Sequence, residues 1–227
     1  MAKQEHRYIQ RHDIFLRITH WTFSVGGTLL ALTGLVLFIP GLNHALGYNV
    51  AIITSHIHHG IGACFVIIPL VCWIIRPRNF IHTFKNIFAK WDDDDKLFMK
   101  HFLPYLFKPG KYIMPKQHFA KSGQRLSDMA FYFIVFILMI TGVLLMIGLP
   151  GLPVWLFSLS LLGHRLAFMG FAIIFPLHVY LGGGIFQPYH RMSRVMFGDG
   201  CVSESDALYH WGYWADEELE AGKYKLE

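Results

Sequence analysis

Charged side chains are scarce in this chain, and four long stretches lack them altogether. Lys, Arg, Asp and Glu make up 15% of the 227 residues, whereas 54% are hydrophobic and the mean hydropathy is +0.39. A stretch of about 20 apolar residues is long enough for an α-helix to cross a bilayer. The four uncharged stretches are residues 20–39, 57–75, 129–148 and 166–186. This composition excludes an ordinary soluble domain and predicts an all-α membrane protein, a bundle of four transmembrane helices.

Cysteine is also rare, which limits the metal chemistry of the chain. Cys64, Cys72 and Cys201 lack metal-type spacing and provide no framework for an iron–sulfur cluster. We expect Cys64 and Cys72 to be packing residues in the second span and Cys201 to be a free thiol. No small-residue cleavage site follows the basic N-terminus, so we interpret the first span as an uncleaved anchor. No internal repeat is strong enough to support an argument.

The basic residues that are present predict the topology. All but one of the 20 Lys and Arg residues precede Trp21, lie between Arg76 and Arg125, or follow from Arg191 onward; the exception is Arg165. By the positive-inside rule, both termini and the long loop then face the cytoplasm. The pI of about 9.1 therefore reflects topology and contact with anionic lipids, not nucleic-acid binding. We predict a cytoplasmic segment 1–19, a membrane domain 20–186 with cytoplasmic loop 76–128, and a cytoplasmic tail 187–227.

Three segments outside the spans carry further expectations. Residues 149–163 are apolar but interrupted by Pro150, Gly151 and Pro153, which predicts a separate interfacial helix on the outer side. The acidic run 92–95 is typical of an exposed turn or a helix N-terminus. The tail contains Trp211 and Trp214 and is suited to docking or to lying at the membrane surface.

Six of the 14 histidines lie in or at the ends of the spans, where polar side chains are costly and usually functional. We expect ordinary loop or interface roles for the other eight, which are His6, His12, His44, His82, His101, His118, His190 and His210. His164 opens the fourth span on the outer side, and His178 lies 14 residues further in, about 21 Å along a helix and on nearly the same face. His20 shares the inner level with His178. One member of the cluster His56, His58 and His59 shares the outer level with His164.

Two levels of paired imidazoles predict two b-type haems, each with two axial histidines. Taken singly, a histidine at the end of a span is more often an interfacial or hydrogen-bonded residue. Within the outer cluster, His56 and His58 each precede a glycine by one helical turn, Gly60 and Gly62, and a small residue there leaves room for a flat macrocycle. We select His58 because it lies closer to the hydrocarbon than His56 and shares the helix face of Gly62. His56 and His59 stay open as alternatives. The abundant glycines also fit simple close packing of helices.

These residues resemble a known family. Arg17-Ile-Thr-His20-Trp21, followed by Leu32-Thr-Gly-Leu-Val-Leu-Phe38, is similar to the first helix of the gamma (cytochrome b) subunit of membrane-bound formate dehydrogenases. Similar features are Thr141-Gly-Val, the spacing of His164 and His178, and the tail Val202-Ser203…Ala207…His210…Trp214. The resemblance covers most of the chain. Its histidine framework is shared with b-type cytochromes of hydrogenases, and the tail is the more specific part.

The resemblance implies an outer haem held by His58 and His164 and an inner haem held by His20 and His178. It also implies a menaquinone site beside the inner haem and His178, formed partly by the segment before the third span. That segment reads Lys121-Ser122-Gly123-Gln124-Arg125, where the family has an Asn-Ala-Gly-Gln pattern. Gly123 and Gln124 match the family, and Lys121 stands at the asparagine position. We expect Gln124 and Lys121 to bind or protonate the quinone and Asp128 to relay protons.

The implied function is electron transfer from formate to menaquinone or ubiquinone in the cell inner membrane. Electrons would come from a molybdenum or tungsten alpha subunit through an iron–sulfur beta subunit, with the oligomeric state of the heterotrimer left open. No catalytic residue for formate oxidation is expected in this chain. One alternative is the cytochrome b subunit of another quinone-linked complex, such as a nickel–iron hydrogenase. A second alternative is a haem-free membrane anchor or transporter with histidines on a proton path.

Overall fold

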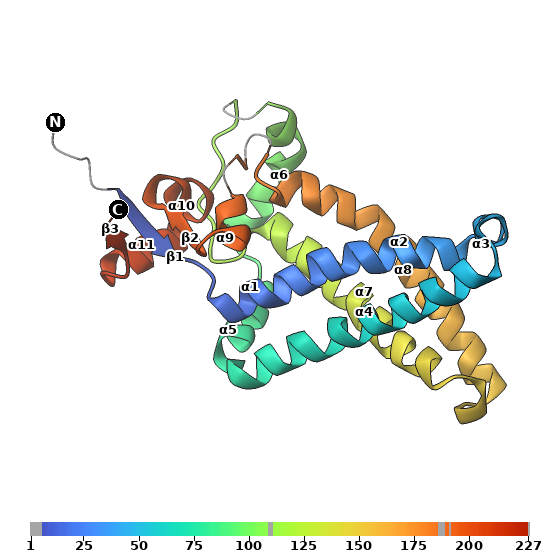
Figure 1. Ribbon diagram of the computed structural model, residues 1–227. Helices are drawn as coiled ribbons and strands as arrows, with labels where there is room; N and C mark the ends of the chain where they lie inside the picture. The colour runs from blue at the N-terminus through green and yellow to red at the C-terminus, as the bar shows by residue number, and fades with distance from the viewer. Residues whose placement is uncertain (1–5, 109–110, 186–188, 191, 227) are drawn as a thin grey trace. The chain divides into compact units, whose positions relative to one another are not determined.

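The computed structural model describes residues 6–108, 111–185, 189–190 and 192–226 (Figure 1). The chain divides into two compact units. One, the helical unit, consists of Ile18–Arg76 and Ala130–Pro176. The other, the mixed unit, consists of Met1–Arg17, Pro77–Met129 and Leu177–Glu227. The three segments of the mixed unit are far apart in the sequence and form one compact unit in the fold.

Four helices are long and apolar enough to cross a membrane, as the sequence predicts. They are Ile14–Phe38, which joins α1 (Ile14–Trp21), η1 (Thr22–Gly26) and α2 (Gly27–Phe38), then α4 (Tyr48–Ile75), α7 (Ser122–Ile147) and α8 (Val154–Gly182). Many of their large apolar side chains are exposed in the isolated chain, for example Ile173 at 74% and Phe133 at 67%. Such an apolar exterior suits lipid rather than water. The chain is therefore a multi-pass membrane protein.

The second and fourth helices begin earlier than the sequence analysis expected. α4 begins at Tyr48, after the short helix α3 (Pro40–Leu46), so the cluster His56–His59 lies inside a helix instead of at its start. The separate interfacial helix over residues 149–163 is wrong. Pro150 and Gly151 form the short turn η2 (Leu149–Gly151), and Pro153 directly precedes α8. Proline is well tolerated at a helix start because the first turn has no hydrogen bond to lose.

As a result, His164 lies ten residues into α8 and does not open it. α8 ends at Gly182, followed by Gly184 with a φ of +67°, a left-handed conformation that glycine adopts freely. The expected end of the fourth span at residue 186 lies outside the described residues, as do Lys3 and Arg191 among the basic residues.

The interior of the helical unit is built from aromatic rings against small residues. α2 and α4 lie side by side (Figure 1). Phe65 and Phe171 are each 5% exposed. A Cβ placed on Gly27 would come within 3.1 Å of Phe171 Cζ, so glycine is what lets this ring approach α2 so closely.

The three cysteines are free. The thiol of Cys201 is buried and donates a hydrogen bond to Gln10 Oε1 over 3.3 Å. Cys72 is buried as expected, whereas Cys64 is exposed on α4 and does not serve as a packing residue.

The mixed unit adds a small antiparallel sheet to the otherwise helical fold. Its strands lie in the order β2 (Cys201–Ser203), β1 (Arg7–Gln10) and β3 (Lys225–Leu226). Ile9 pairs with Val202, and Tyr8 pairs with Lys225, so both edges of the N-terminal strand bind the C-terminal segment. The helices of this unit are α5 (Pro77–Ile87), α6 (Asp93–Phe107), α9 (Ser193–Phe197), α10 (Glu204–His210) and α11 (Gly212–Glu220).

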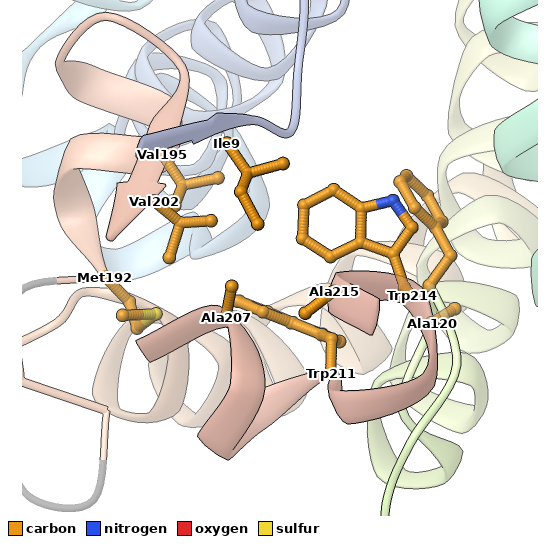
Figure 2. Close-up of a cluster of buried hydrophobic side chains, with 10 residues drawn as sticks. Ile9, Ala120, Met192, Val195, Val202, Ala207, Trp211, Trp214 and Ala215 are labelled. Carbon is orange, nitrogen blue, oxygen red and sulfur yellow. The ribbon is translucent and has the colours of Figure 1, made fainter. Parts of the chain in front are cut away.

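The core of the mixed unit buries the two tail tryptophans. Trp211 and Trp214 are 7% and 6% exposed, and Ala207 and Ile9 are fully buried. Figure 2 shows Ile9 from β1 and Val202 from β2 facing Ala207 and Trp211 across this cluster. These tryptophans are therefore core residues, and the expectation that the tail docks or lies at the membrane surface stays a prediction. The two tryptophans hold the tail to the N-terminal strand.

The acidic run 92–95 begins α6, one of the two roles expected for it. Asp92 and Asp95 form a capping box, in which each side chain accepts a hydrogen bond from the other residue's backbone N–H. Asp95 is 1% exposed and also accepts a 2.7 Å hydrogen bond from Arg125 Nη1 and one from Ser122 Oγ. Arg125 in turn donates to the carbonyls of Ile87 and Ala89, so this buried ion pair ties α7 to the end of α5.

Candidate functional site

Two histidines from different helices face each other inside the helical unit. The ring centres of His58 on α4 and His164 on α8 are 6.3 Å apart, and the ring planes are inclined at 75°. Both side chains are half-buried. They line a cavity of about 600 Å³ whose walls are mainly apolar, with contributions such as Leu30, Leu138 and Phe168. The polar pair thus lies in a partly open cavity with mainly apolar walls.

The same hydrogen bond orients each of the two rings. Thr33 Oγ1 lies 2.9 Å from His58 Nδ1, and Thr141 Oγ1 lies 2.9 Å from His164 Nδ1. Because each Nδ1 has a partner on a neighbouring helix, each Nε2 is the nitrogen left to bind a ligand.

The residues present fit a haem with two axial histidines. Imidazole nitrogens bind metal ions at about 2 Å, and ring centres 6.3 Å apart leave room for one metal ion between two facing nitrogens. Among the described residues, no group of three or more His, Cys, Asp or Glu side chains is arranged to hold a metal ion. In a haem, the macrocycle would supply the remaining ligands. Gly34 and Gly142 lie beside the two rings: a Cβ there would lie 3.4 Å and 3.6 Å from Cε1 of His58 and His164, in ordinary contact.

Of the three clustered histidines, His58 is the one that faces His164. Its ring centre is also 6.4 Å from that of His59, but His56 and His59 are both exposed. Four consecutive residues of a helix point in four different directions, and the packing of α4 decides which direction is inward. The geometry therefore favours the residue that Gly62 indicated in the sequence.

The expected inner ligands, His20 and His178, belong to different units and are each described within their own. His20 Nδ1 lies 3.3 Å from Ser24 Oγ, and the π-helical segment Thr22–Gly26 follows it almost directly. Such π-bulges are frequent at functional sites. His178 lies one turn before Gly182, where a Cβ would come within 3.6 Å of His178 Nε2. Both histidines thus have features of a ligand site, and their pairing stays a prediction.

The residues expected at the quinone site lie at the start of α7 and just before it. Gln124 donates a 3.3 Å hydrogen bond to Asp128 Oδ2. Gly123 packs against Phe98 and Phe102, where a Cβ would lie 3.5 Å from the ring of Phe102. Lys121 is 5% exposed. This segment therefore combines an amide, a carboxyl group and an amine within eight residues.

Lys121 has a partner that sequence reasoning missed. Its Nζ lies 2.6 Å from Nδ1 of His210 and 4.4 Å from the ring centre of Tyr189. Burial, together with the nearby charge of Arg11, holds the pKa of Lys121 well below its ordinary value. His210 is 4% exposed and does not have the ordinary loop role that we expected. No local signal in the sequence connects two residues 89 positions apart.

Arg11 is a second functional candidate that the sequence did not reveal. Its guanidinium lies 3.7 Å from the ring centre of Trp211, and it donates a hydrogen bond to the carbonyl of Phe119. Burial lowers the pKa of Arg11 to about 9, and the charge of Asp128 acts in the opposite direction. Arg11 Nη1 and Trp211 Nε1 are both buried and have no hydrogen-bond partner among the described residues.

Comparison with known proteins agrees with this geometry. The model of the prokaryotic cytochrome b561 family matches residues 11–192, a range that includes His20, His58, His164 and His178. No curated protein matches the chain. The family match, the four apolar helices and the facing histidines describe a membrane protein that binds b-type haem and transfers electrons. The chain belongs to the prokaryotic cytochrome b561 family.

Proposed function

We propose that this chain is the dihaem cytochrome b subunit of a quinone-linked oxidoreductase of the formate dehydrogenase type. It would pass electrons from an iron–sulfur partner subunit across the membrane to menaquinone or ubiquinone. The observation that carries the proposal is the pair His58 and His164, which face each other over 6.3 Å in an apolar cavity.

The roles of the ligands follow from this geometry. His58 and His164 would hold the outer haem through their Nε2 atoms, because both Nδ1 atoms are engaged by threonines. His20 and His178 would hold the inner haem. Bound haem b supplies a reversible one-electron iron couple. With haem bound, the mainly apolar walls around the outer pair would lower the local dielectric constant.

The distribution of charge supports an orientation with both termini in the cytoplasm. The mixed unit contains every Lys and Arg of the chain except Arg76 and Arg165. By the positive-inside rule, a unit that contains most of the Lys and Arg residues is expected on the cytoplasmic side. Anionic lipids of that side of the membrane would attract it.

Quinone reduction would take place beside the inner haem, at Lys121, Gly123, Gln124 and His178. Reducing a quinone to the quinol consumes two protons as well as two electrons, so donors must be available at its oxygen atoms. Gln124 and Asp128 are hydrogen-bonded to each other and could exchange that bond for one to the quinone. The buried pair Lys121 and His210 offers a second exchangeable proton.

The choice of formate dehydrogenase rests on the resemblance in the tail. Its residues Ala207, His210 and Trp214 are buried in the mixed unit, which gives each a structural reason to be retained. The expected partners are an iron–sulfur beta subunit and a molybdenum or tungsten alpha subunit. Copurification from the native membrane, followed by identification of the partners, tests this choice. A nickel–iron hydrogenase as the copurified enzyme would replace it.

The haem content is tested by the absorption spectrum of the purified protein. We expect a b-type α-band after reduction and two haems per chain. A spectrum without that band would contradict the proposal and favour the haem-free anchor or transporter.

A further inference from the structure

The two halves of the outer site repeat one arrangement. On α2, Thr33 and Gly34 face His58 of α4, the next long helix; on α7, Thr141 and Gly142 face His164 of α8. The distance from Oγ1 to Nδ1 is 2.9 Å in both cases. The chain therefore contains a short structural repeat, a Thr-Gly pair opposite a histidine, that the sequence alone did not disclose.

The backbone bonds of the threonines determine the direction of the bonds to histidine. Thr33 Oγ1 is 2.8 Å from the carbonyl of Leu29, and Thr141 Oγ1 is 2.6 Å from that of Ile137. A carbonyl can only accept, so each hydroxyl donates its one proton to its own helix. The hydroxyl oxygen then accepts from Nδ1–H of the histidine. Both imidazoles are thereby held in the tautomer whose Nε2 lone pair is available to iron.

We propose that Thr33 and Thr141 are positioning residues that fix the tautomer and rotation of the two axial histidines and so tune the redox potential of the outer haem. This inference rests on the proposed function, in which His58 and His164 hold that haem. At the next position, Gly34 and Gly142 lie beside the edge of each imidazole, with a Cβ there 3.4 Å and 3.6 Å from Cε1. In both halves the threonine provides the hydrogen-bond acceptor.

The expected direction of the effect follows from the chemistry of the ligand. Accepting a hydrogen bond from Nδ1–H makes the imidazole a stronger electron donor, which stabilises ferric over ferrous iron. Loss of the hydroxyl should therefore raise the midpoint potential of the outer haem. It should also free the ring to rotate, and the low-spin ferric EPR signal depends on the angle between the two ring planes, here 75°.

The experiment compares Thr33→Val, Thr141→Val and the double variant with the wild type. Valine keeps the shape of threonine but cannot accept the bond. The matched control is Thr28→Val, because Thr28 Oγ1 makes the same kind of bond, 2.7 Å to the Ser24 carbonyl, on the same helix. Redox titration followed at the α-band and EPR spectroscopy are the readouts. The outer haem is identified as the one missing from His164→Ala.

We expect each single Val variant to shift the outer haem to higher potential and to alter its EPR signal, with a larger shift in the double variant. Thr→Ser variants should restore the wild-type potential, and Thr28→Val should leave it unchanged. Loss of the outer haem alone would also support the proposal, since the inner haem then reports an intact fold. If a Val variant fails to accumulate, Thr→Cys is measured instead, with a smaller shift in the same direction expected because a thiol is the weaker acceptor.

An unchanged potential and EPR signal in the double variant, with both haems retained, would overturn the inference while leaving the proposed function intact. A shift of the potential by Thr28→Val as large as that by Thr33→Val would overturn it equally. A wild-type protein without b-type haem would instead contradict the proposed function itself.

Discussion

The helical unit and the mixed unit both bury polar side chains, but they satisfy them in different ways. In the helical unit, His58 has a threonine partner on the neighbouring helix and mainly apolar residues around it. In the mixed unit, Lys121 lies among His210, Tyr189, Trp211 and Arg11, which come from three other parts of the chain. The first arrangement needs only two adjacent helices, whereas the second needs the complete fold of its unit.

This difference teaches where each unit is vulnerable. A membrane helix satisfies its own backbone, so a buried side chain can be changed there without unfolding the helix. In the mixed unit, the helices are short and the sheet has three short strands, so tertiary contacts carry the stability. Substitutions should therefore remove a function in the helical unit and remove stability in the mixed unit.

The largest effect is expected at the outer ligands. His58→Ala removes one of the two proposed ligands of the outer haem and should lower the haem content from two per chain to one, with the fold retained. The matched control is His59→Ala, which changes the adjacent exposed histidine and should keep both haems. Pyridine haemochrome analysis gives the count. If His58→Ala keeps both haems and His59→Ala loses one, the ligand assignment within the cluster is wrong.

At Asp95 we expect a large loss of stability without a loss of haem. The side chains of Asp95 and Arg125 are each 2% exposed, and Asp95→Ala leaves the guanidinium buried without its carboxylate. Breaking such a pair costs about 3–5 kcal/mol of stability. Denaturation of the purified protein, followed by circular dichroism, measures the loss, and the haem absorption of the folded variant should match that of the wild type.

The control for that variant is Asp93→Ala. Asp93 pairs with Lys96 at 2.7 Å, but its side chain is 99% exposed, and such surface pairs contribute little. We expect stability close to that of the wild type. Equal losses for Asp93→Ala and Asp95→Ala would show that burial is not what distinguishes the two carboxylates.

The smallest effect is a change in the pH dependence of stability. Because the pKa of Lys121 is held well below its ordinary value of about 10.4, unfolding takes up a proton at pH values between the two. The unfolded state then binds more protons, so Lys121 makes stability rise with pH across that window. Lys121→Met should flatten this rise in melting temperature between neutral and alkaline pH. Parallel pH profiles for the variant and the wild type would contradict the depressed pKa.

The sequence determined the features that follow local rules. Four apolar stretches predict four membrane helices because a bilayer admits few other backbone structures, and the described residues form four such helices. The histidines could be recognised because a polar side chain at membrane depth is costly and therefore rare. Gly62 indicated His58, since residues four apart share a helix face.

Other features depended on contacts that no local pattern encodes. Pro153 was interpreted as a helix breaker, yet it precedes α8, because proline disrupts a helix interior but fits its start. Pairing of the N-terminal strand with the tail buried Trp211 and Trp214, and joined Lys121 to His210. The hydrogen bonds of His58 and His164 to Thr33 and Thr141 emerged in the same way. Short polar side chains in helices are common, and their role is decided by which residue of another helix packs opposite them.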